Sequence, residues 1–512
     1  MYDYIVVGAG SAGCVIASRL TENRQTSVLL IEAGPPDKAR EIHIPAAFSK
    51  LFKTPVDWNF STEPQEHLNR RELYWPRGKM LGGSSSMNAM IYVRGSRADY
   101  DHWRDLGNEG WGFDDLLPCF QAAESSSGGP QSVTAQKDPN PLSHVFLEAC
   151  EKTGIPRVDD FNSDLNPDGQ EGAGFYQVTQ KNGSRCSTAD AYLRPALGRG
   201  NLTVWTGIHV TRVLIENGRA VGVEYSQKGS LHHVRAGREV VLSAGAIGSP
   251  HLLLLSGIGP ARGLEAQGIH VAVDLPGVGE NLQDHLAVIL PYFCKQPITL
   301  NGAETFSNLM KYVLRKRGPL TSNVAEAGAF VKSRSNLPLY DLQILFGPAH
   351  YVNHGLTNPG GHGFSLGPVL LTPSSCGRIT LRSADPTAPP AIDPAYLSDP
   401  EDLARLVEGV KLTRRIAQHA AFDPYRGDPV FETPGDLPDY VRARAETLYH
   451  PVGTCRMGND PGSVVNAKLQ VYGVVGLRVV DASVMPSIPR ANTNAATIMI
   501  AEKGARIMKE GS

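Results

Sequence analysis

Three glycines near the start of the chain, Gly8, Gly10 and Gly13, have the spacing of a turn that binds a pyrophosphate. In such a turn the first glycine permits the tight bend, the second lets backbone N–H groups approach the phosphates, and the third lets a helix pack closely on a strand. Glu32 follows about 20 residues later, where an acid accepts hydrogen bonds from ribose hydroxyls and repels a 2′-phosphate. These residues predict a dinucleotide-binding site.

The residues around this turn supply the elements that position it. Apolar runs at 4–7 and 28–31 predict two buried strands, and the second ends on Glu32. The segment between them carries apolar residues at helical spacing: Ala12, Val15, Ile16 and Leu20. Strand, glycine turn, helix, strand and acid in this order form a βαβ unit, whose helix N-terminus adds partial positive charge to the site.

Length and composition limit the classes of function. The chain has 512 residues, enough for two large domains, and 41% of them are hydrophobic. Lys and Arg (49) nearly balance Asp and Glu (51), which argues against a nucleic-acid partner and favours small molecules. The seven cysteines are scattered with no CxxC pair, as expected of free thiols in a reducing compartment rather than of disulfides or a zinc site.

No segment has the character of an export signal or a membrane span. No Lys- or Arg-led apolar region precedes residue 4, and no run of about 18 apolar residues occurs. We therefore expect a cytoplasmic protein. Peripheral contact with the inner face of a membrane stays open, because a surface patch need leave no hydropathy signal.

The middle of the chain predicts antiparallel sheet and a second ligand-facing strand. Residues 202–225 alternate as in an antiparallel meander that turns at Asn217 and Gly218. A buried strand at 240–242 enters a run of small residues and then an apolar helix at 251–255. The small residues favour close approach of the backbone to a ligand.

The last 200 residues change character twice. From about 310 to 440, short strands such as 377–381 and helices such as 401–417 predict a second, substrate-facing domain. A strand at 477–481 then ends in an acid, and a C-terminal helix follows with one apolar side formed by Ile498, Ala501, Ala505 and Met508. We expect this last part to return to the nucleotide-binding domain.

Four segments in this order resemble the signatures of the glucose-methanol-choline (GMC) family of FAD-dependent alcohol oxidoreductases. They are the opening βαβ unit, 76–95, 243–259, and 449–458 together with 481–503. Within the family, the blocks 178–183, 321–326 and 449–458 look closest to bacterial dehydrogenases of aliphatic primary alcohols and polyethylene glycol, then to choline dehydrogenase. Oxidases of hydroxymethylfurfural and aryl alcohols are similar to the chain in much of the same sequence.

The resemblance implies an α/β (α+β) fold with two domains. A Rossmann-like FAD-binding domain would comprise 1–155, 196–305 and 446–512, with the catalytic residues in the last part. A substrate-binding domain built on an antiparallel sheet with helices would comprise 156–195 and 306–445.

The same resemblance assigns the catalytic residues. Oxidation of a primary alcohol needs a base for the hydroxyl proton and an acceptor for the carbon-bound hydride, which is flavin N5 in this family. The family's catalytic histidine falls on His450. Asn492 matches a second catalytic position, where an amide hydrogen-bonds the alcohol oxygen but takes no proton. Asn494 lies two residues further on, and capping of the C-terminal helix explains it as well as a role in the site does.

The cofactor contacts implied by the resemblance come from all four segments. Val210 matches a position whose backbone contacts adenine, Asp481 and Ala482 match pyrophosphate neighbours, and the helix near Asn494 would lie over the flavin pyrimidine. Met87 stands where covalent members carry the histidine that bonds the ring, so we expect non-covalent FAD. The expected contacts are Gly8, Gly10, Ser11, Ala12, Gly13, Glu32, Ala33, Gly82, Gly83, Ser84, Asn88, Ala89, Val210, Ala244, Gly245, Asp481, Ala482, Asn492 and Thr493.

Other residues suggest weaker hypotheses. His350, His354 and His362 lie in a Gly- and Pro-rich stretch without matching carboxylates, which favours a loop near the substrate entrance over a metal site. The serines at 84–86 lack the G-x-S-x-G elbow of a hydrolase. Four aromatic residues are candidates either for the alcohol pocket or for plain core: Trp58, Phe346, Tyr351 and Tyr449.

The predicted activity is oxidation of a primary alcohol to the aldehyde, with electrons passed to a quinone-like acceptor or to oxygen. The resemblance favours an acceptor other than oxygen. Three alternatives stay open: a non-redox catalyst of the same fold, such as a hydroxynitrile lyase, a photochemical or non-catalytic flavoprotein, and a nicotinamide dehydrogenase. The preferred alcohol depends on pocket shape, which motifs do not report.

Overall fold

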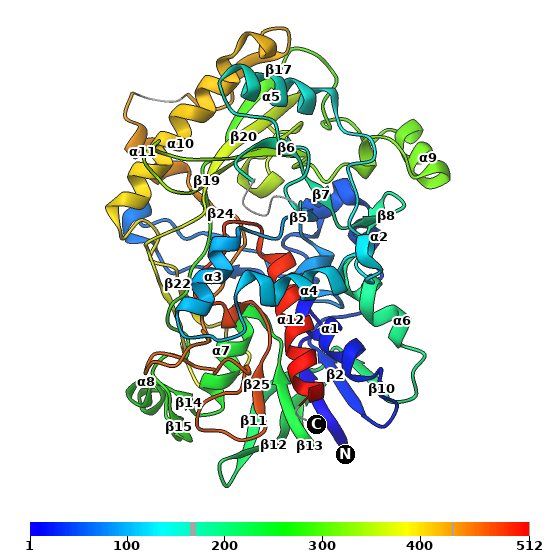
Figure 1. The fold of residues 1–512 in the computed structure, drawn as a ribbon, viewed down its shortest axis with the longest axis vertical. Helices are drawn as coiled ribbons and strands as arrows, with labels where there is room; N and C mark the ends of the chain where they lie inside the picture. The colour runs from blue at the N-terminus through cyan, green and yellow to red at the C-terminus, as the bar shows by residue number, and fades with distance from the viewer. Residues whose placement is uncertain (164–169, 433–434, 511–512) are drawn as a thin grey trace.

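Two large sheets and the helices that cover them make up the structure, a computed structural model that describes residues 1–163, 170–432 and 435–510. In Figure 1 one sheet lies in the lower half of the molecule, with the N-terminal and C-terminal segments, and the other lies in the upper half. Helices occur in both halves, the lower sheet has mixed strand directions and the upper sheet is antiparallel, which confirms the predicted fold class.

The lower sheet is parallel at its centre, in the order β10-β2-β1-β13, with β25 beside β13. The strands of this parallel part are β1 (Tyr2–Val7), β2 (Val28–Glu32), β10 (Leu202–Thr206), β13 (Ser230–Leu242) and β25 (Leu477–Val479), and an antiparallel hairpin extends the sheet beyond β13. β2 is buried throughout, as expected of a parallel strand covered on both faces. α1 (Ser11–Leu20) joins β1 to β2 and packs against α12 (Thr493–Glu510), so the first and last helices lie side by side in Figure 1.

The predicted meander is only partly correct. β11 (His209–Glu216) and β12 (Arg219–Gln227) form the antiparallel hairpin, and the turn residues Asn217 and Gly218 have φ of 49° and 73°. β10, however, pairs in parallel with β2, with Leu202 opposite Val28. After β10 the chain bends around the end of β2, where the Ile208 N–H donates to the Glu32 carbonyl, instead of making a hairpin.

The helix after β13 begins earlier than the sequence predicts. α7 runs over Gly245–Leu255, so the small residues expected in a loop form its first turns. Asp481, more than 200 residues away, accepts a hydrogen bond from the Gly245 N–H at 2.9 Å and so helps to fix the start of the helix. The helices expected at 401–417 and at the C-terminus are confirmed as α10 (Pro400–Gln418) and α12, with the predicted apolar side of α12 buried.

The upper sheet is antiparallel, with the order β18-β19-β20-β16-β24 and with β17 joining β20 to β23. Its strands are β16 (Leu286–Ala287), β17 (Leu290–Cys294), β18 (Ala327–Val331), β19 (Leu342–Gly347), β20 (Gly363–Leu370), β23 (Arg426–Pro429) and β24 (Glu446–Thr447). Helices α5 (Pro141–Lys152), α10 and α11 (Leu437–Arg444) pack around it, as the top of Figure 1 shows.

Shorter elements connect the two halves. The small strand pairs are β3 (Phe60–Ser61) with β4 (Tyr74–Trp75), β5 (Ile91–Tyr92) with β7 (Gln177–Val178), β8 (Gln180–Lys181) with β9 (Ser184–Arg185), β14 (Ile258–Gly259) with β15 (Val273–Asp274), and β21 (Arg378–Thr380) with β22 (Ala391–Asp393). The other helices are α2 (Arg40–His43), α3 (Arg97–Asp105), α4 (Phe113–Ala123), α6 (Arg194–Ala196), α8 (Ala261–Ala266) and α9 (Phe306–Arg315), and β6 (Gly172–Phe175) lies against β18.

Sheet membership bears on the predicted division into domains. Residues 286–294 belong to the upper sheet, although the sequence assigns 196–305 to the FAD-binding domain. The boundaries at 155, 195, 305 and 445 stay predictions, and 164–169 of the segment 156–195 lie outside the described residues. All seven cysteines are free thiols. Among the described helices, none is both long and apolar enough to cross a bilayer.

Candidate active site

A single cavity of about 860 Å³ brings most of the predicted site residues together. It is lined by the ends of β1, β2 and β13, by the first turns of α1, α7 and α12, and by β16, β19, β20 and β24 of the upper sheet. Of the predicted residues it takes His450, Gly8, Gly10, Ser11, Ala12, Glu32, Ala33, Gly83, Ser84, Asn88, Ala89, Val210, Ala244, Gly245, Asp481, Ala482, Asn492 and Thr493. Gly13 and Gly82 lie behind this wall.

The opening glycines differ in what surrounds them. A Cβ on Gly13 would lie 1.8 Å from the Gly8 carbonyl oxygen, so this glycine is needed where α1 packs on β1. Gly8 itself has φ of 97°. A Cβ on Gly10, in contrast, would meet no atom closer than 4.0 Å, because Gly10 faces the cavity. This open cradle beside a helix N-terminus fits a pyrophosphate.

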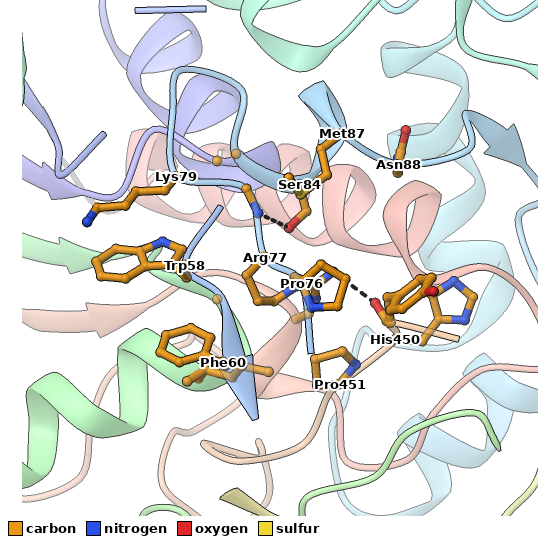
Figure 2. A pocket seen from close by; sticks show the side chains of 18 of the residues that line it. Trp58, Phe60, Pro76, Arg77, Lys79, Ser84, Met87, Asn88, His450 and Pro451 are labelled. Carbon is orange, nitrogen blue, oxygen red and sulfur yellow. Dashed lines mark hydrogen bonds between the residues drawn. The ribbon is translucent and has the colours of Figure 1, made fainter. Parts of the chain in front are cut away.

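The segment 76–95 docks directly onto the opening turn. Gly82 donates its N–H to the Ala9 carbonyl at 2.7 Å, and a Cβ on Gly83 would lie 2.7 Å from the Gly10 Cα. Figure 2 shows Ser84, Met87 and Asn88 following in sequence along the cavity wall. The Asn88 Oδ1 accepts from the buried Arg185 guanidinium at 2.8 Å.

Glu32 occupies the end of β2 with both carboxyl oxygens aimed at backbone donors. They accept from the Ala9 N–H at 2.9 Å and from the Gly34 N–H at 2.8 Å. Burial raises the pKa of Glu32 to about 7, against these two stabilising hydrogen bonds. Lone pairs remain for ribose hydroxyls, which suits the role that the sequence predicts.

Three helix N-termini meet the cavity, those of α1, α7 and α12. Each carries partial positive charge of the kind that favours a bound anion. Ser11 of α1 donates its hydroxyl hydrogen to the Asn494 Oδ1 at 2.7 Å and so ties α1 to α12. Because α12 already begins at Thr493, Asn494 is a helical residue bonded to Ser11 rather than the cap ahead of the helix.

His450 lies at the other end of this wall, half-buried, with a neighbour at each ring nitrogen. Its Nδ1 lies 2.9 Å from the Nδ1 of His285, and its Nε2 lies 3.3 Å from the Nδ2 of Asn492. Its backbone N–H donates to Asp284 Oδ1 at 2.7 Å. Asp284 also accepts from the hydroxyls of Thr447 and Tyr396, and burial raises its pKa to about 6.

The hydrogen bonds of His285 decide which nitrogen of His450 carries the proton. His285 Nε2 lies 3.1 Å from the Leu371 carbonyl oxygen, which only accepts, so Nε2 is the protonated nitrogen. Burial lowers the pKa of His285 to about 3, so its Nδ1 is a bare acceptor at neutral pH. His450 must then donate from Nδ1, which leaves the Nε2 lone pair facing Asn492 and the cavity.

Gln343 of β19 sets the orientation of Asn492. Its Nε2 lies 2.8 Å from the Tyr176 hydroxyl and 3.5 Å from the Asn492 Oδ1. With a donor on that side, the Asn492 amide presents its own N–H to His450 Nε2. An alcohol oxygen placed between the two would donate to the imidazole and accept from the amide.

The pKa of His450 is held well below its usual value. Burial is the main cause, and the Arg77 guanidinium adds repulsion. A protonated His285 would add further repulsion, but its own low pKa keeps it neutral at physiological pH. Arg77 is close because its Nη2 donates to the Tyr449 carbonyl at 2.9 Å, a bond that Figure 2 shows beside His450. The imidazole is therefore neutral at physiological pH and available as a base.

The backbone just before His450 is strained and pinned. Tyr449 has φ of 67°, in the region that favours glycine. Its N–H donates to Thr447 Oγ1 at 2.8 Å, and its hydroxyl contacts the Tyr351 hydroxyl at 2.8 Å and His354 Nδ1 at 2.5 Å. These contacts hold the turn that aims the imidazole.

The four aromatic candidates all line the cavity, but not in one place. Trp58 stacks on Phe60 and lies 6.0 Å from the ring of His209, beside the position assigned to adenine. Figure 2 shows Trp58 and His450 on opposite sides of Arg77, so Trp58 is remote from the base. In the part of the chain that the structure describes, no cluster of metal-ligating side chains occurs, and His350 and His362 do not join His354 at Tyr449.

Sequence reasoning missed Asp284, His285 and Gln343. Gln283, Asp284 and His285 are three adjacent polar residues between Leu282 and Leu286, and this local pattern could have marked a buried polar site. Gln343 gives no such signal, because one polar residue in an apolar strand indicates neither its partner nor its direction.

Two family models match the chain, GMC oxidoreductase over residues 2–287 and the GMC oxidoreductase C-terminal model over 373–501. The chain belongs to the GMC oxidoreductase family. It is 47% identical to an uncharacterized GMC-type oxidoreductase of Mycobacterium tuberculosis, covering 99% of each chain. It is 45% identical to the alcohol dehydrogenase [acceptor] of Pseudomonas putida, covering 99% of this chain and 96% of that one. Human mitochondrial choline dehydrogenase is 43% identical, with 99% and 90% covered.

Solved structures agree with this assignment. Pyridoxine 4-oxidase from Mesorbium loti superposes with a TM-score of 0.91 at 32% identity, covering 100% of this chain and 99% of that one. Formate oxidase of Aspergillus oryzae, whose FAD is the subject of related structures, gives a TM-score of 0.93 at 27% identity, with 100% and 98% covered. FAD is thus the cofactor expected of this enzyme, an oxidoreductase of CH–OH donors, and its relatives do not favour a non-redox activity.

Proposed function

We propose that the enzyme oxidises an uncharged primary alcohol to the aldehyde, with His450 as the base. The observation that carries this proposal is the pairing of the His450 Nε2 lone pair with the Asn492 amide, 3.3 Å apart on the cavity wall. His450 takes the hydroxyl proton, and Asn492 donates a hydrogen bond to the oxygen as negative charge grows there. FAD, when bound, supplies the acceptor for the hydride.

The residues that would hold FAD fall into three groups, according to the part of FAD that each would contact. Glu32 suits the ribose hydroxyls, and Gly10 with the α1 N-terminus suits the pyrophosphate. The N-terminus of α12 suits the pyrimidine end, which gains negative charge on reduction. Met87 lines the cavity and its thioether cannot form the histidyl linkage of covalent relatives, so acid precipitation should release all the flavin to the supernatant.

The wall that the upper sheet contributes near His450 supports an aliphatic substrate. Its members are mostly apolar: Ala287, Ile289, Val324, Ala325, Leu345, Phe346, Leu366 and Leu448. An alkyl chain gains free energy from contact with such a surface, whereas a charged group would lose its hydration there.

A quaternary ammonium alcohol is the second candidate, because Glu446 also lines the cavity near Tyr351 and Tyr449. Burial raises the pKa of Glu446, against the attraction of Arg71 and Arg444, which weakens its case as a cation site. We expect the uncharged alcohol to reduce the flavin at lower concentration than choline. The opposite order would make Glu446 the recognition residue.

Anaerobic bleaching of the yellow holoenzyme by a panel of alcohols tests the activity. His450→Ala should slow flavin reduction on the order of 10²-fold or more while FAD stays bound, whereas the exposed His67 serves as a matched control for the same substitution. A persistent oxidised spectrum across the panel would favour a non-redox or photochemical role, and a colourless, NAD-dependent enzyme would reveal a nicotinamide dehydrogenase. Near-normal reduction by the variant would remove His450 from the mechanism.

The electron acceptor belongs to the same proposal. The P. putida relative at 45% identity carries "acceptor" in its name, which supports an acceptor other than oxygen. The acceptor that we propose is quinone-like, and the exchange would take place on the cytoplasmic side of a membrane. Reoxidation of the reduced enzyme by air and by a soluble quinone should show the quinone to be faster. Faster reoxidation by air would make the enzyme an oxidase.

A further inference from the structure

Helix α9 carries more exposed large apolar side chains than any other described helix or strand. Five of the twelve large apolar side chains that are exposed in the described residues lie on this helix. Their exposed fractions are 78% for Phe306, 43% for Leu309, 36% for Met310, 57% for Val313 and 71% for Leu314. Figure 1 shows α9 standing out from the body of the protein at the right of the view.

The helix points its polar side at the protein and its apolar side away. Tyr312 is its buried residue, and the Tyr312 hydroxyl donates to the His43 carbonyl at 3.0 Å. Asn308, one turn earlier, is half-buried and bonds to the Ala303 carbonyl. The five apolar residues repeat at spacings of three and four and so form a stripe on the opposite face. A surface helix normally turns such a stripe toward the core.

The charges within the helix and the turn after it have one sign, and Glu304, just before the helix, pairs with Lys50. Residues 305–318 contain Lys311, Arg315, Lys316 and Arg317 and no acid, although the whole chain has a formal charge of −2. Arg317 pairs with Asp138 at 2.5 Å, and Lys316 packs over the Tyr312 ring. Lys311 and Arg315 form no ion pair with any carboxylate of the described residues, and both are exposed. Lys311 flanks the stripe beside Leu314, whereas Arg315 lies on the other side of the helix.

We propose that α9 is the surface by which this enzyme docks on an anionic lipid bilayer. An amphipathic helix with basic flanks lies in the plane of the membrane interface, its apolar side chains among the acyl chains and its cations at the headgroups. A second copy of this chain is a poorer occupant, because a two-fold contact through α9 would bring two basic segments together. The inference goes beyond the reaction proposed above and does not depend on it.

The position of α9 would place the cavity near a bilayer on which the helix docks. The helix leads into the short turn Pro319–Thr321, which packs on the turn Pro45–Leu51. Phe48 of that second turn lines the cavity, and Lys50 beside it pairs with Glu304, just before α9. Docking through α9 would bring the cavity wall that carries Phe48 close to the bilayer, from which an apolar alcohol or a lipid-soluble acceptor could be taken.

Vesicle sedimentation of the holoenzyme tests the proposal. We expect binding to vesicles of phosphatidylglycerol and phosphatidylcholine, weak binding to phosphatidylcholine alone, and loss of binding at high salt. Phe306→Ser with Leu314→Ser should lower the partition coefficient at least about 10-fold, because each removes a side chain that inserts. Leu231→Ser, which changes an equally exposed leucine on β13 (62%), is the matched control and should bind as wild type.

A second double variant tests whether the basic residues of α9 contribute to binding. Lys311→Gln with Arg315→Gln should lower binding to the anionic vesicles about 25-fold, at about fivefold for each cation, and leave turnover of a water-soluble alcohol unchanged. The proposal is overturned if wild type ignores anionic vesicles or if neither pair of changes weakens binding. It is equally overturned if sedimentation in free solution shows a dimer that Phe306→Ser with Leu314→Ser dissociates, because α9 would then be a subunit interface.

Discussion

Removal of the acceptor that His285 offers to His450 tests the tautomer on which the proposed base depends. His285→Leu leaves the buried Nδ1–H of His450 without a partner, 2.9 Å from where the acceptor stood. An unpaired buried donor costs about 1–3 kcal/mol, so the tautomer with the proton on Nδ1 becomes less stable by that amount. The fraction of enzyme whose Nε2 lone pair is free should then fall about 5- to 150-fold. Flavin reduction should slow by the same factor.

His285→Asn is the matched variant. Its carbonyl oxygen reaches about as far as the Nδ1 of the imidazole and can accept from His450, although the bond to the Leu371 carbonyl is lost. We therefore expect His285→Asn to reduce flavin faster than His285→Leu. His285 is neutral near pH 7, so neither change removes a charge there. Because a bond from Nδ1–H favours the imidazolium of His450, the acid limb of the rate should lie at lower pH in His285→Leu than in His285→Asn.

Anaerobic stopped-flow absorbance with a saturating alcohol measures these rates across pH. In wild type the rate should be flat above pH 6.5 and fall only in more acidic buffer, because the pKa of His450 lies well below 6.5. A wild-type rate in His285→Leu, or equal losses in the leucine and asparagine variants, would refute the tautomer argument. An acid limb at the same pH in the leucine and asparagine variants would refute the electrostatic part.

Three further predictions concern the cofactor cradle and the amide. Ribose hydroxyls donate to ionised Glu32, whose pKa without FAD is about 7. FAD affinity, measured by flavin fluorescence, should therefore fall as the pH drops below 7, and Glu32→Gln should make the affinity less dependent on pH. Gly13→Ala, which forces a Cβ to 1.8 Å from a backbone oxygen, should lower the free energy of unfolding by about 1–3 kcal/mol or more, whereas Gly198→Ala, with open space around it, should not. Gln343→Met should slow flavin reduction about 2- to 13-fold by freeing the Asn492 amide to flip, and an unchanged rate would show that Asn492 is oriented by other contacts.

Local sequence was enough to predict the nucleotide half of the fold. β1, α1 and β2 follow from apolar runs and three glycines within 32 residues, because each contact in that unit is short in sequence. β10 was placed wrongly because parallel pairing depends on a distant strand, and its alternation is the same in either kind of sheet.

The candidate base could be predicted, but its support could not. His450 and Asn492 were assigned by resemblance to a family signature, whereas His285 and Gln343 act through distances that only the folded chain creates. The start of α7 shows the same limit, because its first N–H is bonded to Asp481 from the far end of the chain. Contacts between segments hundreds of residues apart leave no periodicity in either segment.

The low pKa of His450 constrains when this base can hold a proton. Burial and the nearby Arg77 make an imidazolium costly in the resting site. The cost falls once negative charge arises in the same cavity, as it does when a flavin is reduced, since opposite charges attract strongly where water is excluded. The N-terminus of α12 also favours that negative charge, by about 0.3–1 kcal/mol, and Asn492 immediately precedes this helix. The C-terminal segment thus carries both a group that gains positive charge and a helix end that stabilises the negative one, so we infer that uptake of the proton and reduction of the cofactor favour each other.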